Sequence, residues 1–275
     1  MNPHASKSTS PIQLAKSLVS NRSLIKGLIK REIIGRYRGS FMGLLWSFFN
    51  PLLMLAVYTF VFSVVFKARW VGGIGSRTEF AMILFAGLTA FNLFSEGLLR
   101  GPSLILGNAN YVKKVIFPLE ILPVVVLGSA IFHFLVSFVA WLVFYVLLIG
   151  TPPATIFELP LVLLPMVLMS LGASWLLASL GVFLRDIGQI IGVLTMVLMY
   201  VTPIFYPVAA LPEDYQFLMS LNPLTASIEQ VRNAMIFGTS LDWTGWLRQL
   251  ALGAAVAWLG FAWFQKSRKG FADVV

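Results

Sequence analysis

The chain has 275 residues, of which 58% are hydrophobic and only 11% are charged, and its mean hydropathy is +0.86. Soluble domains contain about 25% charged residues, so this composition excludes a soluble enzyme and indicates a protein that faces lipid. The sequence lacks cysteine and has two distant histidines, His4 and His133, which argues against disulfides and a metal site. The net charge of +9 favours basic cytoplasmic loops over nucleic-acid binding.

The first forty residues divide into a tail and a helix. Residues 1–21 are rich in Ser and Asn and predict a flexible amino-terminal tail. Residues 22–40 carry apolar side chains three and four positions apart, which predicts an amphipathic helix. Its Lys and Arg residues favour the cytoplasmic membrane interface, where anionic lipid attracts them, and an ordinary solvated helix is the alternative.

Residues 41–265 contain six hydrophobic segments. The first, at 41–66, is uncharged and exceeds the ~20 residues that a bilayer core of about 30 Å requires, and Pro51 predicts a kink near its start. The other five cover residues 79–99, 118–149, 156–184, 187–206 and 243–264. The sequence therefore predicts an all-α integral membrane protein with six transmembrane helices and a cytoplasmic tail at 266–275.

Residues 207–242, between the fifth and sixth predicted spans, are richer in proline and acidic residues. Asn222-Pro223 is typical of a helix start, with Asn as the cap and Pro at the first helical position, and Gly238 is typical of a stop. The enclosed helix is too short to cross a bilayer. We therefore expect short re-entrant helices at the outer face, where they form an outer gate region.

The distribution of basic residues predicts the orientation. With the amino terminus inside, fifteen of the twenty Lys and Arg residues fall in cytoplasmic segments and five fall outside. Cytoplasmic loops are enriched in Lys and Arg, so both termini are expected in the cytoplasm.

Polar residues within the spans are candidates for function because they are costly in hydrocarbon. Asn92, Glu96 and Arg100 recur at four-residue spacing, and Glu96 can pair with Arg100; a structural ion pair is favoured over a functional one. His133 lies between Ser129 and Ser137 on one helix face. Hydrogen bonding between helices is favoured for His133, with substrate contact or proton relay as the alternative.

The sequence contains no Gly-x-x-x-x-Gly-Lys-[Ser/Thr] phosphate-binding loop. Any use of ATP must therefore be carried out by another chain.

Several segments together resemble the type-2 ABC exporter permeases of bacterial surface polysaccharides. In chain order these segments are Arg36-Tyr37-Arg38-Gly39-Ser40, Gly43-Leu44-Leu45-Trp46, Asn50-Pro51-Leu52, Asn110–Pro118 with Glu120-Ile121-Leu122-Pro123, Leu184-Arg185-Asp186-Ile187, Pro203–Pro207 and Leu221-Asn222-Pro223-Leu224. Their order and spacing are more specific than any one of them. Leu119 departs from the family, which often has a basic residue there, and this leaves the charge network around Glu120 open.

The resemblance implies a bacterial inner-membrane subunit that forms a homodimer and docks two cytoplasmic ATP-binding-cassette ATPases, which bind the ATP and Mg. It implies export of a lipid-pyrophosphate-linked polysaccharide, with O-antigen preferred over capsule or teichoic acid. A membrane enzyme acting on polyprenyl-linked sugars is a weaker alternative because acidic residues are scattered. A secondary carrier is disfavoured because its middle spans would carry more acids.

The same resemblance assigns three groups of residues. Substrate binding is expected at Arg36, Tyr37, Arg38, Trp46 and Tyr58. ATPase docking is expected at Asn108, Asn110, Tyr111, Lys113 and Lys114. Structural or gating roles are expected for Glu96, Arg100, Glu120, Arg185, Asp186, Pro207, Asn222 and Pro223.

Within the substrate group, arginine forks suit a pyrophosphate and aromatic rings suit sugar rings. The alternatives are that the arginines anchor the helix to anionic lipid and that most aromatic residues form an interfacial belt.

Overall fold

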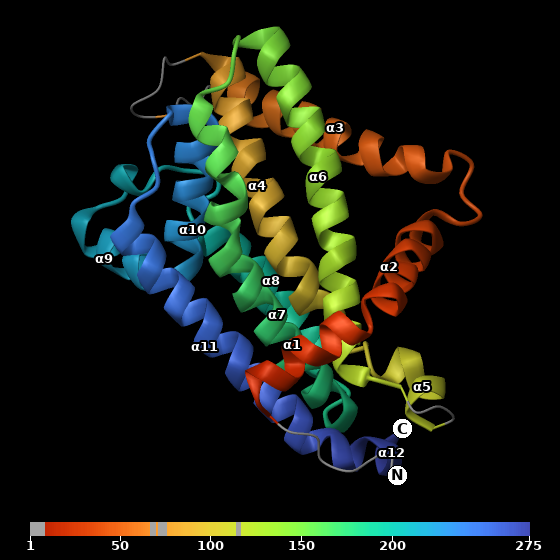
Figure 1. The fold of residues 1–275 in the computed structure, drawn as a ribbon. Coiled ribbons are helices and arrows are strands. Elements are labelled where there is room, and N and C mark those ends of the chain that lie inside the picture. Colours follow the sequence, from red (N-terminus) through yellow and green to blue (C-terminus); the bar gives the residue numbers. More distant parts are fainter. Residues whose placement is uncertain (1–8, 67–69, 71–75, 114–116) are drawn as a thin grey trace.

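The computed structural model describes residues 9–66, 70, 76–113 and 117–275, and across these ranges the chain forms helices joined by turns, without strands (Figure 1). The α-helices are α1 (Pro11–Ser20), α2 (Arg22–Tyr37), α3 (Trp46–Tyr58), α4 (Arg77–Arg100), α5 (Ala109–Lys113), α6 (Leu122–Leu148), α7 (Leu159–Phe183), α8 (Ile187–Val201), α9 (Glu213–Leu221), α10 (Pro223–Arg232), α11 (Trp243–Ser267) and α12 (Phe271–Val274). Wider π-helical stretches, Thr59–Val65 and Asn233–Phe237, continue α3 and α10. The all-α prediction is confirmed.

Five helical segments of the described chain are long and apolar enough to cross a membrane. They are Gly43–Phe62, Thr78–Arg100, Leu119–Leu148, Ala154–Phe183 and Trp243–Val274. These correspond to five of the six predicted spans. The remaining one corresponds to α8, whose 15 residues are apolar but fewer than the ~20 that a crossing requires.

The second span, α4, forms the centre of the bundle. Its most apolar window is 83% buried, whereas that of the span containing α3 is only 11% buried. Helices α6, α7 and α10 pack around α4, and α7 packs along α11 in the most extensive helix pair of the described residues. Figure 1 shows the segment between α2 and α3 extending away from this bundle as an elbow, while α2 packs against α6.

Two glycines make the elbow possible. Gly39 and Gly43 have φ angles of +84° and +53°, a left-handed backbone conformation that costs little only for glycine. They reverse the chain between the end of α2 and the start of α3. Since α3 then meets the bundle along one side only, apolar side chains such as Phe49, Leu53 and Val57 are exposed and suited to lipid.

Both ends of the described chain are helical and contact the bundle. Pro11–Ser20 form α1, and Leu14 and Leu18 pack against a hydrophobic cluster at this end of the bundle. In the carboxy-terminal segment 266–275, Phe271 is fully buried in the same cluster. In each case a few apolar residues, spaced on one helix face, suffice to anchor a polar segment.

Candidate functional site

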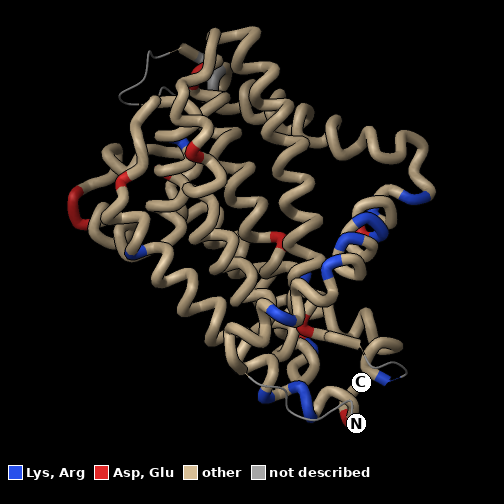
Figure 2. Tube along the Cα trace, viewed as in Figure 1, with Lys and Arg blue, Asp and Glu red and all other residues tan. Residues whose placement is uncertain are grey.

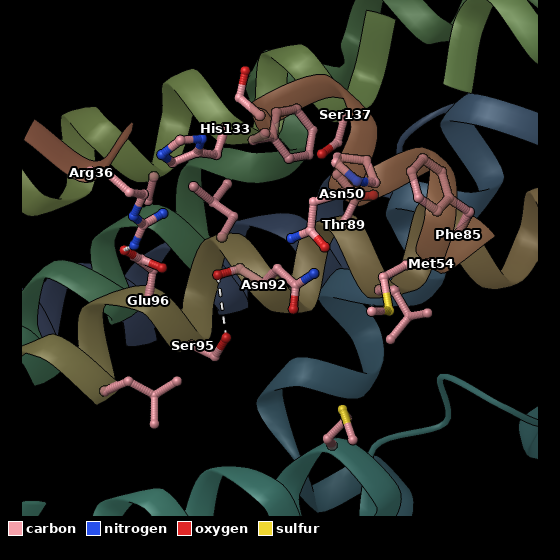
Figure 3. Close-up of a pocket in the computed structure, with 18 of the residues that line it drawn as sticks. Arg36, Asn50, Met54, Phe85, Thr89, Asn92, Ser95, Glu96, His133 and Ser137 are labelled. Atoms are coloured by element: carbon pink, nitrogen blue, oxygen red, sulfur yellow. Dashed lines mark hydrogen bonds and ion pairs between the residues drawn. The ribbon is translucent and has the colours of Figure 1, made fainter. Parts of the chain in front are cut away.

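A cavity of about 430 Å³ separates α3 from α4 and α6 (Figure 3). Helix α2 contributes Arg36 and Tyr37 to its wall, and α8 contributes Met199. The cavity exists because the elbow directs α3 away from the bundle, and it lies within one subunit.

Polar side chains make up part of the cavity wall, although its helices are apolar overall. The small hydroxyl and amide side chains among them are Ser47, Asn50, Thr89, Asn92, Ser95 and Ser137. Thr89, Asn92 and Glu96 follow each other at spacings of three and four on α4, and therefore share one face. Polar side chains at membrane depth characteristically face a cavity or a bundle interior, so this face is built for a hydrogen-bonding ligand.

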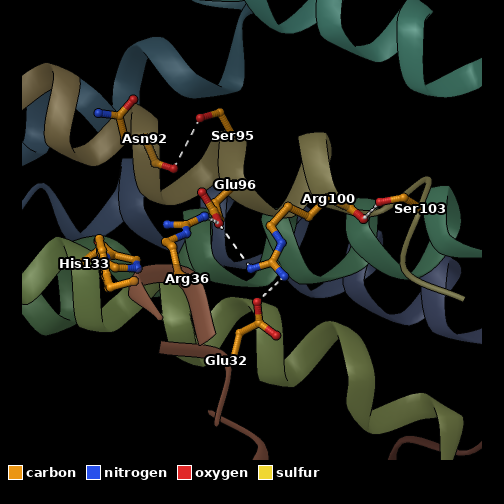
Figure 4. A network of polar contacts seen from close by, with 9 residues as sticks. Glu32, Arg36, Asn92, Ser95, Glu96, Arg100, Ser103 and His133 are labelled. Carbon is orange, nitrogen blue, oxygen red and sulfur yellow. Dashed lines mark hydrogen bonds and ion pairs between the residues drawn. The ribbon is translucent and has the colours of Figure 1, made fainter. Parts of the chain in front are cut away.

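Four charged residues form a network beside this wall, at the end of α4 where Arg100 lies (Figure 4). Glu96 lies between Arg36, with which it pairs, and Arg100, whose Nη1 is 3.5 Å from Glu96 Oε1. Arg100 also pairs with Glu32 of α2. The two guanidinium groups and two carboxylates cancel, so the network ties α2 to α4 without leaving a net charge at the cavity.

Tyr37 and His133 form a second link between α2 and the bundle. The Tyr37 hydroxyl is 3.3 Å from His133 Nδ1, and the two rings meet edge to face at 5.8 Å. Burial raises the pKa of Tyr37, so its phenol stays protonated at neutral pH and can donate this hydrogen bond. His133 Nε2 is buried without a hydrogen-bond partner among the described residues.

The structure gathers part of the predicted substrate group. Arg36, Tyr37 and Tyr58 line the cavity, whereas Arg38 and Trp46 are exposed and do not. The predicted Glu96–Arg100 pair is confirmed, since its partners are one helical turn apart. Sequence reasoning did not identify Ser47, Asn50 and Thr89 as site residues. For Thr89, its spacing from Asn92 and Glu96 was the available signal.

The predicted docking residues lie on two short consecutive helical turns, Leu106–Asn108 and α5. Asn110 and Lys113 are exposed there, while Asn108 donates to the Leu104 carbonyl at 2.8 Å. Tyr111 instead faces the protein, stacking on Phe117 at 4.3 Å and accepting a hydrogen bond from Arg31 at 2.8 Å. Lys114 lies outside the described residues.

Glu120 pairs with a basic residue, Arg268, that is distant in sequence, since position 119 is leucine. Arg268, from the carboxy-terminal segment, donates from Nη1 to Glu120 Oε2 at 2.7 Å, and both side chains are almost fully buried. By contrast, Arg185 and Asp186 are exposed in the turn between α7 and α8.

The expected helix start after residue 221 is confirmed. Asn222 Oδ1 accepts from the Leu224 N–H at 3.0 Å, and Pro223 occupies the first helical position of α10. Gly238 follows the helix with φ +65°, as expected of a stop. Pro207 precedes a single helical turn, Val208–Ala210, and α9 follows. Short helices between α8 and α11 are thus present.

Comparison with known proteins agrees with a bundle of apolar spans. The profile of the family described as "ABC-2 type transporter" matches residues 23–236, more than three quarters of the chain. The chain belongs to this family. The ABC-2 match begins in α2 and extends through α10, so it includes every helix that lines the cavity.

Curated members of the ABC-2 family are similar over nearly the whole chain. The O-antigen export system permease protein RfbA of Myxococcus xanthus is 27% identical over 96% of this chain and all of its own length. The protein of the same name from Klebsiella pneumoniae is 26% identical over 92% of this chain and 95% of its own. The capsule polysaccharide export inner-membrane protein CtrC of Neisseria meningitidis serogroup A is 25% identical over 82% of this chain and 83% of its own.

Proposed function

We propose that this chain is the membrane subunit of an ABC exporter that carries a lipid-linked O-antigen polysaccharide across a bacterial inner membrane. The observation that carries the proposal is a cavity inside an ABC-2 type bundle that carries hydroxyl and amide groups and whose two charged lining residues, Arg36 and Glu96, pair with each other. Neutral hydrogen-bonding groups flanked by tyrosines suit sugar units, which offer hydroxyl groups and apolar ring faces. The O-antigen permeases similar to this chain support the choice of cargo.

The proposed working unit is a homodimer in which each subunit uses α8 as its sixth span and the short helices α9 and α10 as re-entrant elements. Both termini lie in the cytoplasm in this proposal. Figure 2 supports that orientation, because Lys and Arg concentrate along α2 and at the end of the bundle near α12. Acidic residues instead mark the start of α9, away from these basic segments.

Cargo recognition is proposed to divide between the cavity and its approach. Within the cavity, Asn50 and Asn92 would bind sugar hydroxyls while Tyr37 and Tyr58 contact ring faces. Arg36 is neutralised by Glu96, so the exposed Arg38 is better placed for the pyrophosphate. Trp46, exposed on α3, fits the interfacial belt better than a binding role.

Energy is proposed to come from two cytoplasmic ATPase subunits, which hold the ATP and Mg. The exposed Asn110 and Lys113 would contact them. A movement of α5 can be transmitted to the cavity through two side-chain contacts of α2. Tyr111 is bound to Arg31 of this helix, which also carries Arg36, the partner of Glu96 at the cavity. A push on α5 would therefore shift α2 against α4.

Export of a capsule polysaccharide is the second candidate. It is supported by the similarity to two CtrC proteins, whose coverage of the chain, 82%, is smaller than that of the RfbA proteins.

The function is tested in two steps. Cells lacking the gene should lose their long surface glycan and accumulate its lipid-linked precursor inside, and the intact gene should restore export. The purified chain should hydrolyse ATP only together with an ATPase subunit. An unchanged surface glycan in the deleted cells, or ATP hydrolysis by the chain alone, would refute the proposal.

Asn92→Leu is expected to lower export about fivefold without reducing the amount of folded protein. The change removes a hydrogen-bonding amide from the cavity wall while keeping the volume similar, and one hydrogen bond contributes about 1 kcal/mol. Export rate per folded subunit is the measurement. Asn233→Leu serves as the control, since Asn233 is half-buried and lies outside the cavity. Equal export by the two variants would show that Asn92 does not bind the cargo.

A further inference from the structure

Helix α8 ends at a turn that is buried inside the protein. Its 15 residues span about 22 Å, less than the bilayer core of about 30 Å. The turn that follows, Thr202–Tyr206, is buried over Thr202, Pro203 and Ile204. Backbone carbonyl groups at this depth cannot bind water, so they need donors from the protein.

A single side chain from α10 supplies these donors. Arg232 Nη1 donates to the Pro203 carbonyl at 2.6 Å, and Nη2 donates to the Ile204 carbonyl at 2.6 Å. Its Nε donates to the Ile83 carbonyl of α4 at 3.3 Å. Arg232 is only 2% exposed, so its charge lies wholly within the bundle.

The surroundings are shaped for this guanidinium. Its Cζ lies 4.5 Å from the centre of the Trp70 ring, a cation–π arrangement. Gly87 of α4 leaves the necessary space, because a Cβ at that position would approach Arg232 Nη2 to 2.7 Å. Arg232 therefore joins α4, α10, Trp70 and the turn after α8 at one point.

The turn held by Arg232 carries Phe205 into an aromatic cluster, which we define as Tyr58, Phe62, Tyr200 and Phe205. Phe205 stacks on Phe62 at 5.4 Å and on Tyr200 at 5.6 Å, and lies 6.3 Å from Tyr58. Tyr58 also lines the cavity. Along α4, Ile83 is thirteen residues, about 20 Å, from Glu96. The aromatic cluster thus borders the cavity at the end remote from the charged network.

We propose that Arg232 is a positioning residue that holds the Thr202–Tyr206 turn in place, so that Phe205 closes the cavity at the end remote from Glu96. This end faces outward if the orientation in the proposed function is correct. The closure itself does not depend on which polymer is carried. One change, withdrawal of the turn from Arg232, would open the cavity by moving Phe205 away from Tyr58.

Because the chain has no cysteine, a single introduced thiol can report on closure. The reporter is Thr89→Cys, in the cavity wall, and the probe is a membrane-impermeant maleimide applied in turn to either side of the membrane. With Arg232 intact, labelling from the closed side is expected to be slow. Arg232→Met and Phe205→Ala should each raise the rate of labelling from the closed side at least tenfold. Arg232→Lys should raise it only about threefold, because lysine keeps the positive charge but lacks the two Nη groups that bind both carbonyls.

Controls separate closure from folding and from the proposed function. A cysteine at the exposed Ser220, between α8 and α11, should label equally in every background and report intact protein. If Arg232→Met does not fold, Arg232→Lys and Gly87→Ala decide the question, since the added methyl displaces the guanidinium without removing it. If the chain has the opposite orientation in the membrane, the labelling rate would rise from the cytoplasmic side instead of the outer side, and the rise itself would remain.

Two results would overturn the inference. If Phe205→Ala leaves labelling unchanged, the aromatic cluster does not close the cavity. If Phe205→Ala raises the rate but the Arg232 and Gly87 variants do not, Arg232 only stabilises the fold. Neither readout requires the cargo or the ATPase, so both remain informative if the proposed function fails.

Discussion

Gly260→Leu is expected to prevent α7 and α11 from packing and to abolish the folded protein. A Cβ at Gly260 would lie 2.0 Å from the Gly172 carbonyl oxygen, and a Cβ at Gly172 would lie 2.3 Å from that of Val256. These neighbours are backbone atoms, which cannot rotate aside, so the helices would have to separate. Close approach through small residues is a main source of attraction between membrane helices.

The expected loss exceeds about 3 kcal/mol, the upper end of ordinary overpacking costs. It is measured as the fraction of detergent-purified protein that elutes as a folded species, together with its thermal midpoint. Gly192→Leu is the matched control, since a Cβ on that glycine of α8 would meet no described atom within 4 Å. Equal midpoints for the two variants would show that the seam between α7 and α11 is looser than described.

Arg268→Met is expected to destabilise the protein by about 3–5 kcal/mol, because it leaves the carboxylate of Glu120 buried without its guanidinium. Besides the 2.7 Å contact with Glu120, Arg268 Nη2 donates to the Phe117 carbonyl at 2.9 Å. Glu120 also accepts from the Ser17 hydroxyl of α1 at 3.0 Å, and its carbonyl accepts from the Trp175 indole at 3.0 Å. The pair thus joins both terminal segments to the start of α6.

The free energy of unfolding, or the thermal midpoint in detergent, measures this effect. Glu120→Gln combined with Arg268→Met should cost less than Arg268→Met alone, since residue 120 is then neutral and no longer needs the guanidinium. Arg185→Met is the control, because Arg185 is exposed and should change stability by less than about 0.5 kcal/mol. A loss at Arg268 no larger than at Arg185 would contradict the argument.

The sequence predicts well those features that depend on neighbours along the chain. Hydropathy over about twenty residues identifies the five long spans, and Asn222-Pro223 identifies the start of α10. The Glu96–Arg100 pair follows from four-residue spacing.

Features that join distant segments could not be predicted in this way. Arg36 is 60 residues from Glu96, and Arg268 is 148 residues from Glu120, so no periodicity relates the partners. In the predicted orientation Arg232 is one of the five basic residues of the outer side, because it lies between the fifth and sixth predicted spans. Only its contacts with the Pro203 and Ile204 carbonyls reveal a buried role.

The contrast between a buried α4 and an exposed α3 has a consequence for how such proteins diverge. On α4 almost every side chain touches protein, so a change of shape there must be matched by its neighbours. On α3 most side chains need only be apolar, since lipid adapts to any of them. Among relatives only 24–27% identical, we therefore expect substitutions to accumulate faster along α3 than along α4.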